Sequence, residues 1–111
     1  MNDDAIRLQK FFKLMGDESK FNIITSLAGG EKCVCVIYKE LALDQTLVSH
    51  HLSALKKEGL IAGRKDGKWV YYSLNKEYFL QIGEMFARFV KLESFNGSKG
   101  GYGLEIECSG C

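Results

Sequence analysis

The chain has 111 residues, a length that suits one domain and is too short for two. It is 46% hydrophobic and 26% charged with a net charge of +1, which excludes wholesale disorder and a chain that is strongly basic or acidic throughout. No apolar run reaches membrane-spanning length, and the acidic start lacks the basic-then-apolar layout of a signal peptide. We therefore expect a cytoplasmic protein with no membrane partner.

Two helices are predicted in the first third of the chain, because apolar residues recur there at helical spacing. The first helix covers residues 3–15 and ends at Gly16. The second follows an N-terminal signal at Asp17 and stops before the glycine pair at 29–30.

The rest of the chain has the pattern of a helix-turn-helix followed by a β-hairpin. The expected elements are a third helix over about 33–42, a fourth over about 46–58, a strand from Leu60, a turn at Asp66-Gly67, a second strand over 69–74 and a last helix over about 76–92. This order predicts a mainly α winged helix-turn-helix, α-α-α-α-β-β-α. Residues 1–92 would form the DNA-binding and dimerisation domain. Residues 93–111 would be a Gly-rich tail with a short strand near 102–106.

Positive charge is concentrated where the predicted wing lies. Residues 44–76 carry six basic and three acidic side chains, a net charge of +3. Double-stranded DNA is the partner that such a basic hairpin and a polar-faced helix favour, although a solvated turn would have the same composition. The candidate DNA-binding residues are Gln45, Thr46, Ser49, His50, Ser53, Lys56, Lys57, Arg64, Lys65 and Lys68. Adjacent residues on a helix chelate a metal poorly, so we do not expect His50 and His51 to share an ion. Instead, we expect one of the two to face DNA and the other to pack inside.

Four segments resemble the ArsR/SmtB family of metal-responsive repressors. They are DESKFNII at 17–24, DQTLVSHHL at 44–52, LKKEGLI at 55–61 and RKDGKWVYY at 64–72. The likeness covers about residues 5–90 and implies a homodimer that binds an operator without metal and releases it when metal binds. The wide apolar faces of the first and last helices independently favour dimerisation. The candidate dimer residues are Phe11, Phe12, Met15, Phe86, Phe89 and Val90.

Four cysteines, in two close pairs, are the candidate metal ligands: Cys33, Cys35, Cys108 and Cys111. The segment EKCVC at 31–35 resembles the family's ELCVCDL motif for arsenic and soft metals, with Val36 in place of its aspartate. In a regular helix, residues two apart project about 200° apart, so Cys33 and Cys35 would share an ion only if the helix start unwound. We expect an ion to draw these sulfurs together and so alter the helix-turn-helix.

Alternative effectors and functions remain open. Cys33, Cys35 and one tail cysteine would suit As(III) or Sb(III), our leading prediction, whereas all four would suit Cd(II), Pb(II) or Zn(II). A thiol redox or sulfide sensor on the same scaffold would form a disulfide between the pairs. A dithiol enzyme is the third alternative, but no Cys-x-x-Cys after a strand, triad or phosphate loop supports it, so we predict no enzyme activity.

Overall fold

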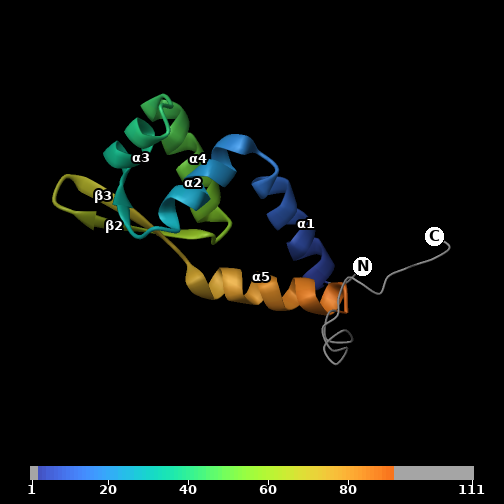
Figure 1. Ribbon diagram of the computed structural model, residues 1–111. Helices are drawn as coiled ribbons and strands as arrows, with labels where there is room; N and C mark the ends of the chain where they lie inside the picture. Colours follow the sequence, from blue (N-terminus) through green and yellow to red (C-terminus); the bar gives the residue numbers. More distant parts are fainter. Residues whose placement is uncertain (1–2, 92–111) are drawn as a thin grey trace.

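Residues 3–91 are described by the computed structural model, and they form five helices and a three-stranded antiparallel sheet. The elements in chain order are α1 (Asp3–Met15), α2 (Glu18–Leu27), β1 (Lys32–Cys33), α3 (Val34–Glu40), α4 (Gln45–Lys57), β2 (Ile61–Asp66), β3 (Trp69–Leu74) and α5 (Lys76–Phe89). Figure 1 shows α2, α3 and α4 gathered beside the β2–β3 hairpin, with α1 reaching α5 at the opposite end. This is the predicted winged helix-turn-helix.

Side-chain caps fix where three of the helices begin. The Asp17 carboxylate accepts a hydrogen bond from the backbone N–H of Lys20 at the start of α2. Asp44 accepts from two backbone N–H groups at the start of α4, and Asn75 accepts from one at the start of α5. Each cap satisfies donors that would otherwise lack a partner in the first turn. Helices α2, α4 and α5 therefore start at residues set by local sequence.

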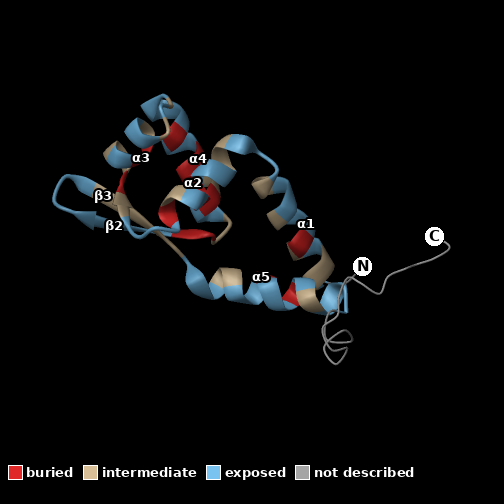
Figure 2. Ribbon diagram, in the orientation of Figure 1, coloured by how far each residue is buried: buried red, intermediate tan, exposed pale blue. Residues whose placement is uncertain are grey.

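The main core lies between the helix-turn-helix and the base of the hairpin. Its buried side chains come from α2, α3, α4 and the start of β2 with the residue before it, whereas a smaller cluster joins α1 to α5 (Figure 2). The main cluster consists of Ile23, Ile24, Leu27, Ile37, Val48, Leu52, Leu55, Leu60 and Ile61. The α1–α5 cluster consists of Leu8, Ile82 and Met85. The hairpin beyond Ile61 contributes nothing fully buried, so it projects from the body.

Strand β1 is the element that the sequence interpretation missed. We expected the third helix to start at Cys33, but that residue is extended, with φ −74° and ψ 150°, and α3 starts at Val34. Cys33 pairs with Tyr71 and Lys32 with Tyr72, which places β1 on the free edge of β3 in the order β1-β3-β2. The expectation was wrong because this pairing joins segments far apart in the sequence, and two residues carry no strand periodicity.

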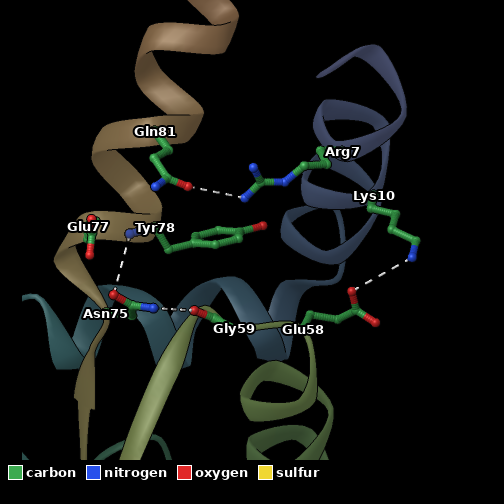
Figure 3. A pocket seen from close by; sticks show the side chains of 8 residues that line it. All are labelled: Arg7, Lys10, Glu58, Gly59, Asn75, Glu77, Tyr78 and Gln81. Atoms are coloured by element: carbon green, nitrogen blue, oxygen red, sulfur yellow. Dashed lines mark hydrogen bonds and ion pairs between the residues drawn. The ribbon is translucent and has the colours of Figure 1, made fainter. Parts of the chain in front are cut away.

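Helix α5 is attached to the body through its first turns. Asn75 Nδ2 donates to the Gly59 carbonyl at 3.0 Å, and the Tyr78 side chain extends toward α1 (Figure 3). A pocket of about 510 Å³ lies where α1, the end of α4 and α5 meet. Arg7 and Gln81 form a 3.5 Å hydrogen bond across it. This pocket is polar and separate from the cysteines.

Two predictions concern the end of the chain. The last helix ends at Phe89 and not near residue 92. The predicted tail over 93–111, with its short strand near 102–106, lies outside the described residues. Within residues 3–91, no helix is long and apolar enough to cross a membrane.

Candidate functional site

The two early cysteines lie side by side at the junction of β1 and α3. The Cys35 thiol donates a hydrogen bond to Cys33 Sγ at 3.1 Å. Cys33 is buried and Cys35 is half-buried. We expected these sulfurs to meet only if the start of the third helix unwound. In the structure Cys33 is extended and precedes α3, so its sulfur lies next to that of Cys35 without distortion of a helical turn.

The hydrogen bond between the two thiols shifts their pKa values in opposite directions. The bond from the Cys35 thiol lowers the pKa of Cys33, and the backbone N–H groups of Cys35 and Val36 act in the same direction. The same bond raises the pKa of Cys35, since its donated proton is held. Thiolates bind soft ions, and of the two sulfurs it is Cys33 whose thiolate form is favoured by these hydrogen bonds.

Two ion pairs connect the residues just before Cys33 to other elements. Glu31 accepts two hydrogen bonds from Arg64 of β2, at 2.8 and 3.0 Å. Lys32 binds Glu40 at the end of α3, with Nζ 2.8 Å from Oε1. Together with the Cys33–Tyr71 pairing, these contacts join the thiol pair to the wing on one side and to the helix-turn-helix on the other. Sequence reasoning did not find Glu31, because its partner is 33 residues away.

The described residues contribute two sulfurs to this site. No group of three or more His, Cys, Asp or Glu side chains that could hold a metal gathers within residues 3–91. The other predicted ligands, Cys108 and Cys111, lie outside the described residues. Their predicted part in the site stays a prediction.

All predicted DNA-contacting residues of α4 are exposed on one side of the helix. At about 100° per residue they span an arc of about 140°. They are Gln45, Thr46, Ser49, His50, Ser53, Lys56 and Lys57. The buried residues occupy the remaining side: Val48, His51, Leu52 and Leu55. The packing of α4 therefore leaves a continuous polar face available to a duplex.

One of the two adjacent histidines of α4 packs inside, as predicted. His50 is exposed, whereas His51 is 8% exposed and its Nδ1 has no hydrogen-bond partner. Burial lowers the pKa of His51 below its ordinary value of 6.5. His51 is therefore a core residue, and its burial favours the neutral imidazole over the charged one.

The wing presents its cations in two different states. Lys65 and Lys68 are exposed near the hairpin tip at Gly67, which has a φ of +64° that glycine tolerates. Arg64, in contrast, is engaged by Glu31 and lies over the Tyr71 ring at 4.8 Å. Lys68 Nζ lies 5.3 Å from the centroid of the Trp69 ring. Both lysines remain exposed, whereas Arg64 would have to leave Glu31 before it could contact a phosphate.

An exposed apolar surface runs along α1 and α5. Phe12 and Phe86 pack edge to face at 5.8 Å yet remain 48% and 40% exposed, and Phe89 and Val90 extend this surface. Of the other predicted dimer residues, Phe11 and Met15 pack against the chain's own core. An apolar surface of this kind on α1 and α5 suits burial against a second copy.

Known proteins resemble the chain in both sequence and structure. Residues 17–62 match the family model described as bacterial regulatory protein, arsR family. The cadmium resistance transcriptional regulatory protein CadC of Listeria innocua is 36% identical over 89 residues, which cover 79% of this chain and 75% of CadC. The arsenical resistance operon repressor of Escherichia coli is 40% identical over 67 residues, 60% of this chain and 57% of that repressor.

A solved structure with the same fold is the homodimeric winged helix-turn-helix DNA-binding domain Mb0332 of Mycobacterium bovis, a possible ArsR-family regulator. It matches with a TM-score of 0.60 and 25% identity, over 90% of this chain and 87% of that domain. The fold, the exposed polar face of α4 and the basic hairpin define a winged helix-turn-helix transcriptional regulator. The chain belongs to the ArsR family and is a transcriptional repressor, not an enzyme.

Proposed function

We propose that this chain is a cytoplasmic, homodimeric repressor that releases its operator when its thiolates bind a soft metal ion or metalloid. The observation that carries the proposal is the 3.1 Å Cys33–Cys35 sulfur contact on a strand that pairs with the wing. Resistance to arsenic and to cadmium, which the names of two relatives state, is the kind of response that such a thiol pair would serve.

The leading effector is As(III) or Sb(III), bound by Cys33, Cys35 and one sulfur from Cys108 or Cys111. Three thiolates suit a trivalent metalloid, whereas four suit Cd(II), Pb(II) or Zn(II). The segment from residue 93 to Cys108 is Gly-rich. In this proposal it brings one of its sulfurs to the site, either within one protomer or from the second protomer.

The proposed mechanism uses the two attachments of the thiol pair. Cys33 belongs to the sheet of the wing, and Cys35 belongs to the first turn of α3. Cys33 and Cys35 would hold a soft ion as thiolates, releasing their two protons to water, and the shared ion would take the place of the thiol hydrogen bond and reset the wing relative to the helix-turn-helix. DNA binding needs α4 in the major groove and the wing on the backbone at the same time, so a changed angle between them weakens operator binding.

The test is operator release measured by fluorescence anisotropy, with a duplex selected by this protein from a randomised pool. We expect arsenite to release the wild-type protein and to leave Cys33→Ser/Cys35→Ser bound. Cd(II) in a parallel titration distinguishes the alternative four-sulfur site. If the double variant still releases DNA with arsenite or Cd(II), the proposal is wrong.

A thiol redox function is the second candidate. The sequence suggested a disulfide between the two cysteine pairs, and the 3.1 Å contact would also let Cys33 and Cys35 form a disulfide with each other. Oxidation by peroxide would remove two electrons and two protons from the thiols and join their sulfurs. The peroxide arm of the titration decides between the functions. Release by peroxide alone, with no response to arsenite or Cd(II), would establish the redox function and exclude the metal function.

A further inference from the structure

We propose that Leu47 determines part of the operator sequence, by contacting the 5-methyl group of a thymine in the major groove. This inference rests on the DNA-binding part of the proposed function and is independent of the effector. The residues of α4 predicted to contact DNA are all polar, so Leu47 is not among them. It adds an apolar contact to that face.

Leu47 is a large apolar side chain that α4 leaves partly in water. It is 40% exposed, whereas the next residue, Val48, is fully buried. Within residues 3–91, the two core clusters and the apolar side chains packed against them are formed without Leu47. An exposed leucine is by itself ordinary, so the place of Leu47 on the helix carries the argument.

Leu47 forms one edge of the exposed side of α4. At about 100° per residue, that side is centred near Thr46, with Gln45 about 100° away in one direction and Leu47 about 100° away in the other. Ala54, which is half-buried, lies about two turns further along at nearly the same angle as Leu47. The side of α4 available to a duplex therefore has a polar edge at Gln45 and an apolar edge at Leu47.

The cap of α4 holds Leu47 in the first turn. Asp44 Oδ2 accepts hydrogen bonds from the backbone N–H groups of Thr46 and Leu47, at 3.0 and 3.1 Å. The Asp44 carbonyl accepts from the N–H of Val48 at 3.0 Å. The N-terminal residues of a recognition helix are the ones that contact base edges. Leu47 is therefore carried to the bases together with Gln45 and Thr46.

The chemistry of the leucine side chain selects one base. It has no hydrogen-bond donor or acceptor, and polar base edges that it covered would lose water without gaining a partner. The 5-methyl group of thymine is the apolar group that the bases of DNA present in the major groove. Contact between this methyl group and Leu47 removes apolar surface of both from water. Leu47 therefore favours thymine over cytosine at the base that it touches.

The test removes the methyl group alone. The reference is a duplex that the full-length protein selects from a randomised pool, and each of its thymines is replaced in turn by deoxyuridine, which lacks only the 5-methyl group. Anisotropy titrations at one salt concentration measure the affinity. We expect at least one replacement to weaken the wild type about fourfold, the effect of one methyl-sized group. Leu47→Ala, which suits a helix, should be insensitive to that replacement.

Two controls separate methyl recognition from weaker binding in general. Lys68→Ala removes a cation of the wing and retains Leu47, so it should bind less tightly overall and keep the fourfold penalty for deoxyuridine. Cytosine and 5-methylcytosine at the same position differ only in the methyl group. The wild type should therefore prefer 5-methylcytosine by about fourfold, and Leu47→Ala should not distinguish the two.

The outcomes distinguish this inference from the proposed function. The inference is overturned if no deoxyuridine replacement weakens the wild type, or if Leu47→Ala shows the same penalty as the wild type. Failure of arsenite and Cd(II) to release DNA would contradict the proposed effector and leave the thymine contact standing. If the wild type selects no duplex, the proposed operator mechanism and this inference both fail.

Discussion

At the scale of single residues, His51 is the clearest conflict between packing and polarity. Its ring is buried in α4 with Nδ1 unpartnered, and an unpaired buried polar atom costs about 1–3 kcal/mol. The charges that act on it are those of Lys20, Asp17 and His50, but burial dominates and lowers its pKa. Because the unfolded chain binds the proton more readily, stability is full above the ordinary pKa of 6.5 and is lost as the pH falls below it.

His51→Leu should therefore flatten the acid side of the stability profile. We expect the wild type to lose free energy of unfolding as the pH falls from 6.5, and the variant to keep it, with equal or higher stability at acidic pH. Urea unfolding followed by circular dichroism between pH 7.5 and about 5 measures this. His50→Gln, an exposed neighbour, is the matched control and should follow the wild type. An unchanged slope in His51→Leu would show that another group titrates.

At the scale of elements, the start of α4 depends on one carboxylate. Asp44 accepts hydrogen bonds from the backbone N–H groups of Thr46 and Leu47, at 3.0 and 3.1 Å. Asp44→Ala should cost about 1 kcal/mol of stability and weaken operator binding, because the first turn of α4 carries Gln45 and Thr46. Urea unfolding and anisotropy titration measure the two effects. Asp44→Asn keeps the cap and should restore most of the stability; failure to do so would contradict the capping role.

The cation Arg64 on β2 is bound to Glu31 and so is not free to contact DNA. Since Arg64 is engaged by Glu31, Glu31→Gln should release it toward the phosphates. We expect tighter operator binding and a salt dependence of log K that steepens by about one for each additional phosphate contact. Lys65→Ala and Lys68→Ala should each make that slope shallower by about one, nearly independently of DNA sequence. Unaltered affinity and salt slope in Glu31→Gln would show that Arg64 plays no part at the duplex.

Local signals predicted most elements, and long-range contacts account for what they missed. Helical periodicity and the N-terminal signal at Asp17 placed the helices, and the Asp66-Gly67 turn placed the hairpin. No local pattern indicated that Cys33 pairs with Tyr71, and this pairing changed the expected thiol geometry. The cysteines themselves could be found by their motif, whereas the position of Trp69 beside their pocket could not, because Trp69 comes from a strand distant in the sequence.

At the scale of the whole molecule, the exposed surface of α1 and α5 sets the oligomeric state that we propose. Phe86→Asp places a charge where burial against a second copy would occur. We expect a monomer by sedimentation velocity and a large loss of operator affinity, because each protomer supplies only a few phosphate contacts. Phe21→Asp changes a phenylalanine on α2 that is 51% exposed, against 40% for Phe86, and should remain a dimer. A Phe86→Asp protein that still sediments as a dimer would place the interface elsewhere.

The short strand β1 has a mechanical consequence for the hairpin. It touches β3 at Tyr71, about four residues from the tip at Gly67, which corresponds to roughly 13 Å of strand. With this contact as a fulcrum, a tilt of about 10° would displace the tip by about 2 Å, more than a hydrogen bond to a phosphate tolerates. A change of a few tenths of an ångström between the two sulfur atoms, acting close to this contact, would therefore move the hairpin tip relative to the nucleic-acid backbone.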